Sequence, residues 1–351
     1  MDIFLYVVLI AVGIALIVKC GDWFVDSASW VAKISGVPTF VIGATIVSLG
    51  TTLPEIITSC IAAGQGSVEL AIGNAVGSVN ANIGLIMAIS LMFIPAIISR
   101  KDFFPKAGLL IIAIGTLWAV CIPGQLYLGL SFIVLAIFVT FIIENLLSAK
   151  RHKAEEINEE SYNTEDGEQV EKKEKYRPKD KKEVVKYIIL FIIGAAGIAG
   201  GAFLLSTFGE KLALRIGELA GIDKHLMAGI VGVTIIAIGT SLPELTTTII
   251  AITKKQHELS IGNIIGANII DIALILPLCT IISTIATGQP LPVNTQTLYL
   301  DLPYCLLAAS IAVIPPLIFK KTMRWQGFVL IGTYACYITL LFLRTFGVLV
   351  F

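Results

Sequence analysis

The segment 43–88, GATIVSLGTTLPEIITSCIAAGQGSVELAIGNAVGSVNANIGLIMA, returns later in the chain as 232–277, GVTIIAIGTSLPELTTTIIAITKKQHELSIGNIIGANIIDIALILP. The two copies align without a gap, and roughly 20 of the 46 positions are identical. Self-similarity of this extent indicates a duplicated unit. The sequence therefore predicts a fold made of two related halves.

The composition indicates a membrane protein. Of the 351 residues, 56% are hydrophobic and 14% are charged, whereas soluble domains carry about 25% charged residues. The apolar runs are continuous and approach the roughly 20 residues that a helix needs to cross a bilayer. We therefore expect an all-α membrane protein with about ten transmembrane helices, at approximately residues 3–20, 38–63, 69–94, 103–122, 126–146, 185–208, 227–252, 258–284, 298–319 and 327–347.

These spans divide into two halves of five, residues 1–149 and 185–351, joined by a linker at 150–184. The linker mixes acidic and basic residues and has few apolar ones, so it cannot bury enough surface to fold alone. Because five is odd, the second half enters the membrane from the opposite face. The expected fold is thus a pair of inverted five-helix repeats, with broken helices and an ion site at their interface near the membrane centre.

The distribution of Lys and Arg predicts the orientation. Basic residues accumulate in alternate connections, at 19–33, 100–106, 254–255, 320–324 and in the linker, and the connection with Lys211, Arg215 and Lys224 is the exception. Because cytoplasmic connections carry the excess of basic residues, we expect a plasma-membrane protein with both termini outside and the linker 150–184 cytoplasmic. The opening residues lack a basic signal-peptide start, so the first apolar run is expected to be a span.

Other classes of function find little support. The net charge is zero and no basic stripe occurs, which argues against nucleic-acid binding. The six cysteines lack C-x-x-C spacings, and the three histidines, His152, His225 and His257, are expected in polar connections. A zinc site or histidine relay in the membrane is therefore not expected. We expect no cofactor and no obligate protein partner, only the lipid bilayer and transported ions.

The repeated motif GTTLPE and GTSLPE places two glutamates, Glu55 and Glu244, deep in equivalent spans. Carboxylates within a membrane are costly and mark ion or proton pathways. The preceding proline, Pro54 or Pro243, removes a helical hydrogen bond and is expected to free the carbonyl four residues back. Hydroxyls lie three and four residues before each glutamate, on the same helical face. They are Thr51, Thr52, Thr240 and Ser241.

The second repeated motif, GNAVGSVNAN at 73–82 and GNIIGANIID at 262–271, contains small-xxx-small glycine pairs that allow close helix packing. Packing does not explain its polar residues. Ser78 and Asn82 lie one turn apart, and Asp271 is the repeat equivalent of Asn82. These side chains are expected to extend an all-oxygen shell, which suits hard cations. Calcium accepts six to eight oxygens in flexible geometry, whereas magnesium demands an octahedron.

With these motifs the sequence resembles the sodium/calcium exchanger branch of the calcium/cation antiporter superfamily, of the prokaryotic type, over the whole chain. The resemblance implies exchange of sodium for calcium by alternating access. It implies that the calcium ligands are Glu55, Glu244, Thr51 and Thr240. It implies that sodium is bound by the same two glutamates and by Ser48, Thr52, Ser78, Ala237 and Ser241. Asn82 and Asp271 correspond to the family's central polar pair.

Two positions depart from the family pattern. Ala267 stands where the family has serine, and Asp271 stands where potassium-independent animal exchangers carry asparagine. Potassium co-transport therefore remains an alternative. So does proton coupling, although the glutamate that typifies proton-coupled relatives, in GN-x-x-E, is absent. A channel is a weaker alternative because inverted repeats favour alternating access. An intramembrane aspartyl protease would need two deep aspartates, whereas the deep acids are two glutamates and one aspartate.

Overall fold

The computed structural model describes residues 2–93, 99–165, 181–219 and 241–345, which are almost entirely helical. Short π-helical stretches, labelled η, interrupt several helices. The first half contains α1 (Asp2–Ser35), α2 (Thr39–Ile42), η1 (Gly43–Val47), α3 (Ser48–Gly64), α4 (Val68–Ala81), η2 (Asn82–Met87), α5 (Ala88–Phe93), α6 (Arg100–Cys121), β1 (Gln125–Leu126) and α7 (Leu128–Glu165). The second half contains α8 (Lys181–Leu219), α11 (Leu242–Thr253), α12 (His257–Ile270), η4 (Asp271–Ile275), α13 (Leu276–Thr287), β2 (Leu291–Pro292), η5 (Thr297–Asp301), α14 (Leu302–Phe319) and α15 (Arg324–Thr345).

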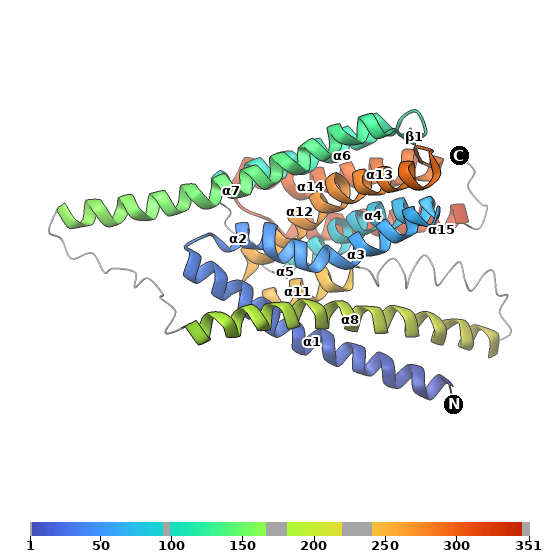
Figure 1. Ribbon diagram of the computed structural model, residues 1–351, viewed down its shortest axis with the longest axis horizontal. Coiled ribbons are helices and arrows are strands. Elements are labelled where there is room, and N and C mark those ends of the chain that lie inside the picture. Colours follow the sequence, from blue (N-terminus) through green and yellow to red (C-terminus); the bar gives the residue numbers. More distant parts are fainter. Residues whose placement is uncertain (1, 94–98, 166–180, 220–240, 346–351) are drawn as a thin grey trace.

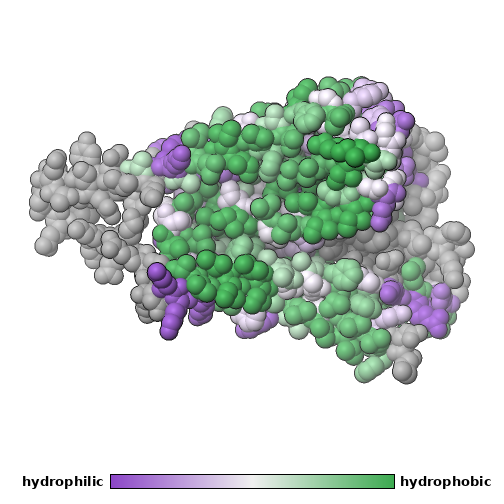
Figure 2. Space-filling model, in the orientation of Figure 1, coloured by the Kyte–Doolittle hydropathy of each residue, from purple (hydrophilic) through white to green (hydrophobic). Residues whose placement is uncertain are grey.

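The helices lie roughly along one common direction (Figure 1). Hydrophobic side chains form a broad band on the visible surface, and hydrophilic ones gather toward the two ends (Figure 2). Within the described residues, nine helical runs are long and apolar enough to cross a membrane. The expected tenth span, 227–252, falls partly outside the described residues, and its described part is the apolar helix α11. The prediction of an all-α membrane fold is confirmed.

The first helices of the two halves, α1 and α8, pack along each other and run in opposite directions (Figure 1). Their crossing is lined by small residues. A Cβ on Gly201 would lie 2.6 Å from the backbone oxygen of Gly13, and one on Gly13 would lie 2.9 Å from the oxygen of Gly201. Such distances are too short for any side chain, so glycine at both positions allows the close approach. Opposite directions for equivalent helices are what an inverted repeat requires.

The centre of the molecule is built from both halves. Helix α12 crosses α2, η1 and α3, while α13 packs on α3 and α4. A Cβ on Gly266 would lie 2.5 Å from Ser48 Oγ and 2.6 Å from the carbonyl oxygen of Ala44. Glycine in the second repeated motif thus lets α12 approach the start of α3 closely, as packing of small residues predicts.

At the end near the start of α1, β1 pairs antiparallel with β2, joining Gln125 to Pro292 and Leu126 to Leu291. The connections that carry these strands hold no Lys or Arg and lie at the end of the molecule where α1 starts. That this end of the molecule faces the cell exterior stays a prediction.

Several element boundaries differ from the sequence prediction. Helix α1 continues to Ser35, α8 extends from Lys181 to Leu219, and α7 runs to Glu165, into the segment predicted as linker. The added part of α1 makes tertiary contacts: Trp30 stacks on Tyr187 of α8 with ring centroids 4.5 Å apart, and Lys254 pairs with Asp22 at 3.1 Å and with Asp26 at 2.9 Å. Polar residues that resemble a connection in the sequence are therefore held in a helix.

The expected helix interruption is also displaced. Pro54 lies inside α3, which is helical from Ser48 to Gly64, and the irregular backbone lies upstream in η1 (Gly43–Val47). Pro243 instead lies in the first turn of α11, where its missing N–H has no helical partner to lose.

Candidate functional site

Helix α3 aligns the polar residues of the first GTTLPE copy along one buried face. Ser48, Thr51, Thr52 and Glu55 are all buried, and the spacing of three and four residues places them on successive turns. The Thr51 hydroxyl can donate to the Ser48 carbonyl or to Asn263 Oδ1, each at 3.2 Å. The helix therefore presents hydroxyls and a carboxylate toward the opposite half.

The second copy begins a helix instead of lying within one. Ser241 precedes α11, and Glu244 lies in its first turn; both are buried. Thr52 Oγ1 donates to Glu244 Oε1 at 3.3 Å, so the two copies of the motif meet directly. Two other predicted site residues, Ala237 and Thr240, lie outside the described residues.

The polar residues of the second motif are buried too. Ser78 lies on α4, while Asn82 and Asp271 are the first residues of the π-helical stretches η2 and η4. The two copies thus change from α to π geometry at equivalent positions. π-Helical turns occur frequently at functional sites. Ala267, which replaces the expected serine, is fully buried on α12.

Packing brings the three deep carboxylates into one region, because α3, which carries Glu55, contacts both α11, which carries Glu244, and η4, which begins at Asp271. Most of their oxygens have no hydrogen-bond donor among the described residues. These acceptors are Glu55 Oε1 and Oε2, Glu244 Oε2, and Asp271 Oδ1 and Oδ2. Asn82 Oδ1 and Ser241 Oγ nearby in the motifs are equally unpaired within the described part. Buried acceptors without donors are costly, and a cation would satisfy them.

Carboxylates alone do not complete a coordination shell. In the described part of the chain, no three His, Cys, Asp or Glu side chains are grouped closely enough to hold a metal ion. Any ion bound here must also use hydroxyl, amide or backbone oxygens. The chain supplies these in Thr51, Thr52, Ser78 and Asn82, and such neutral oxygens are usual ligands of calcium.

Sequence reasoning missed Asn263. Its Nδ2 donates to Thr247 Oγ1 at 3.0 Å, and its Oδ1 is within reach of the Thr51 hydroxyl. One amide therefore links α3 of the first half to α11 of the second. The repeated Gly-Asn dipeptide was the sequence signal that could have pointed to Asn263. In the first copy the equivalent residue, Asn74, donates from Nδ2 to Ser59 Oγ at 2.9 Å.

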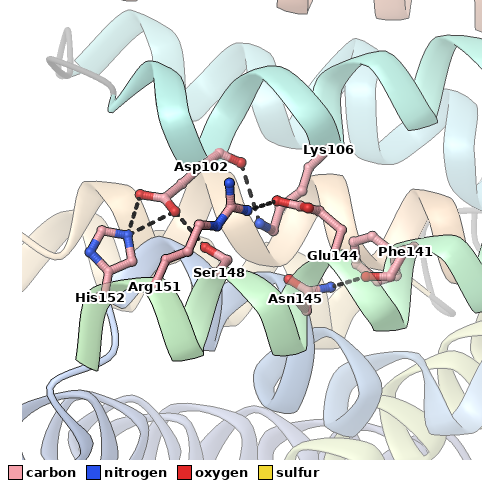
Figure 3. Close-up of polar contacts among 8 residues, drawn as sticks. All are labelled: Asp102, Lys106, Phe141, Glu144, Asn145, Ser148, Arg151 and His152. Carbon is pink, nitrogen blue, oxygen red and sulfur yellow. Dashed lines mark hydrogen bonds and ion pairs between the residues drawn. The ribbon is translucent and has the colours of Figure 1, made fainter. Parts of the chain in front are cut away.

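A second polar cluster joins α6 to α7 (Figure 3). It does not include Glu55, Glu244 or Asp271. The Asp102 carboxylate accepts from Ser148 Oγ at 2.5 Å and lies 2.9 Å from His152 Nε2. The buried Lys106 ammonium donates to the Asp102 carbonyl at 3.3 Å. His152 is thus inside α7 instead of in a polar connection. These contacts connect two neighbouring helices, which indicates a structural role.

Of the other histidines, His257 begins α12 and His225 lies outside the described residues.

Comparison with known proteins agrees with this arrangement. The profile of the sodium/calcium exchanger protein family matches residues 5–146 and 186–343, which are the two helical halves without the linker. The chain belongs to this family. It is therefore a multi-pass membrane transporter of the calcium/cation antiporter superfamily and not an enzyme.

Among relatives of this exchanger, an uncharacterized membrane protein of Methanocaldococcus jannaschii is 29% identical over 328 residues, covering 92% of this chain and 93% of that protein. The sodium/calcium exchanger MaX1 of Methanosarcina acetivorans is 29% identical over 369 residues, covering 95% and 97%. A solved structure of the sodium-calcium exchanger NCX_Mj superposes with a TM-score of 0.74 at 28% identity, covering 97% of this chain and 99% of that one.

Proposed function

We propose that this family member exchanges sodium for calcium across the plasma membrane by alternating access. The observation that carries the proposal is the group of buried carboxylate oxygens of Glu55, Glu244 and Asp271 that have no donor in the described part of the protein. Carboxylates inside a membrane are costly and by default mark ion or proton pathways. The relatives named above as sodium/calcium exchangers support the same choice of ions.

In the proposed mechanism, Glu55 and Glu244 are the central calcium ligands, helped by Thr51 and Thr240. Sodium uses the same glutamates together with five further oxygens, from Ser48, Thr52, Ser78, Ala237 and Ser241. The direct contact between Thr52 and Glu244 supports a site shared by the two halves. Because sodium and calcium require the same carboxylates, they compete. Only a loaded site neutralises enough buried charge for the halves to reorient.

The proposal includes the domain arrangement and orientation. Residues 1–149 and 185–351 form the two repeats, residues 150–184 form a cytoplasmic linker, and both termini face outward. The opposite directions of α1 and α8 support the inversion. Labelling of single cysteines introduced at either end of the hydrophobic band, in intact cells, tests the orientation, and labelling of a linker position from outside would contradict it.

The exchange itself is tested in lipid vesicles loaded with sodium and diluted into sodium-free buffer containing labelled calcium. We expect calcium uptake that collapses when the sodium gradient is removed. Glu55→Gln and Glu244→Gln should each reduce uptake to background while the protein stays inserted. Glu144→Gln is the matched control, because that carboxylate pairs with Arg151 on α7 and should leave uptake unchanged. Full uptake in both site variants would overturn the assignment.

The same vesicles separate the alternatives. Uptake driven by a proton gradient and indifferent to sodium would establish proton coupling, and uptake that needs potassium would establish potassium co-transport. Calcium flux that continues without any counter-ion would establish a channel.

A further inference from the structure

A polar cavity lies between α1, α8 and the turn that follows α11, away from the carboxylates of the ion site. Its volume is about 750 Å³, and it is lined by residues from all three elements. Lys33 comes from α1, Lys186 from α8 and Lys254 from the turn. Three cations from three different elements therefore surround one space at the end where α8 begins.

Two of these cations are available to a ligand. Lys254 is neutralised by Asp22 at 3.1 Å and Asp26 at 2.9 Å, and Asp26 is the one acidic residue that lines the cavity. Among the described residues, neither Lys33 nor Lys186 takes part in an ion pair; the Lys186 ammonium instead lies 5.7 Å from the centre of the Tyr187 ring. The residues that line the cavity therefore include three lysines and one aspartate, an excess of positive charge. Glu183, which accepts a hydrogen bond from Trp30 Nε1 at 3.3 Å, is not among the lining residues.

A buried polar group adds to these charges. Ser29 lines the cavity, and its Oγ is buried without a hydrogen-bond partner in the described part of the protein. An unpaired buried hydroxyl is costly, and its O–H can donate to an anionic oxygen. Two ammonium groups and one hydroxyl together suit the oxygens of a phosphate.

The aromatic and apolar residues around the cavity indicate that the phosphate belongs to a lipid. Trp30 and Tyr187 stack within the cavity wall, with ring centroids 4.5 Å apart, and aromatic residues of this kind gather at membrane interfaces. Beyond them on α8, Ile188 and Ile192 are 50% and 61% exposed. In Figure 2, hydrophilic side chains at this end give way to the hydrophobic band. A group bound here therefore has its polar part at the interface and apolar chains along α8.

We propose that this cavity binds the phosphate headgroup of an anionic phospholipid. Basic pockets between transmembrane helices are suited to such headgroups. Because the lining residues come from α1, α8 and the end of α11, the bound lipid links the α1–α8 pair to the helix that carries Glu244. This site does not depend on which ions are exchanged.

The test uses the intact protein in detergent micelles and the fluorescence of its tryptophans, of which Trp23 and Trp30 line the cavity. Brominated phosphatidylglycerol should quench more strongly and at lower concentration than brominated phosphatidylcholine. In the double variant Lys33→Gln, Lys186→Gln this preference should fall by about fivefold for each lysine removed. The matched control, Lys320→Gln, Lys321→Gln, removes two exposed cations from the turn after α14 and should keep the preference.

Three results would overturn the proposal. Equal quenching by the two lipids would show that no headgroup is selected. An unchanged preference in the Lys33, Lys186 variant, with a monodisperse protein, would place the lipid elsewhere. Complete loss of the preference on adding an equimolar amount of water-soluble glycerol phosphate would assign the cavity to a soluble phosphate.

Discussion

Replacement of Gly266 by alanine tests whether the close approach of the two halves positions the ion site. Gly266 lies on α12, and a Cβ there would meet Ser48 Oγ at 2.5 Å and the Ala44 carbonyl oxygen at 2.6 Å. The serine hydroxyl can rotate away. The carbonyl belongs to the backbone of η1 and cannot, so α12 itself has to move.

The size of the movement follows from these distances. Ordinary contact begins at 3.4 Å, so the 2.6 Å separation must open by about 0.8 Å. Overpacking of this kind costs about 1–3 kcal/mol, and the better helix propensity of alanine offsets about 1 kcal/mol. The net loss of stability is modest. The functional loss should be larger, because displacements near 1 Å in a positioned site cost up to about 100-fold in rate.

We therefore expect Gly266→Ala to lower the thermal unfolding midpoint by only a few degrees while slowing sodium-driven calcium uptake by at least about tenfold. Both quantities are measured on one preparation, by tryptophan fluorescence during heating and by uptake into vesicles. Gly115→Ala on α6 is the control, since a Cβ there meets no described atom within 4 Å. Uptake equal to that of the unmodified protein would refute the argument that this contact sets the site geometry.

Three further changes have definite expected results. Asp271→Asn removes one of the three deep carboxylates, so any dependence of calcium uptake on potassium or protons should decrease; an unchanged ion dependence would exclude Asp271 from coupling. Gly201→Val places branched methyl groups against the Gly13 carbonyl, so thermal stability should drop by several degrees, and an unaltered midpoint would mean that α1 and α8 do not need this approach. Asp102→Asn weakens the contacts with Ser148 and His152 and should cost about 1–3 kcal/mol with calcium affinity retained; loss of affinity at full stability would tie this cluster to the ion site.

Much of the fold follows from the sequence because apolar length and the internal repeat are direct physical signals. The gap-free alignment of the copies was enough to pair Glu55 with Glu244 and Asn82 with Asp271. Their burial could be expected from the motif spacing, since positions three and four residues apart share a helical face. The assignment of individual residues to calcium or sodium stays a prediction.

The π-helical turns and the contacts between distant residues could not be predicted from the sequence. A π-helical turn differs from an α-helical one in its hydrogen bonding and not in residue type, so η1, η2 and η4 could not be foreseen. The partner of Asp22 on α1 is Lys254, more than 200 positions away. The role of Asn263 as a link between α3 and α11 likewise depends on partners brought together only by folding.

The matching π-helical stretches bear on the history of the chain. A single π turn amounts to one extra residue inserted into an α-helix, accommodated as a bulge. η2 starts at Asn82 and η4 at Asp271, which are aligned positions in copies that match without a gap. An insertion acquired after duplication would have shifted one copy against the other. Any residue added to make these bulges is therefore common to both copies, and the duplicated unit carries its widened turn at the same place in each half.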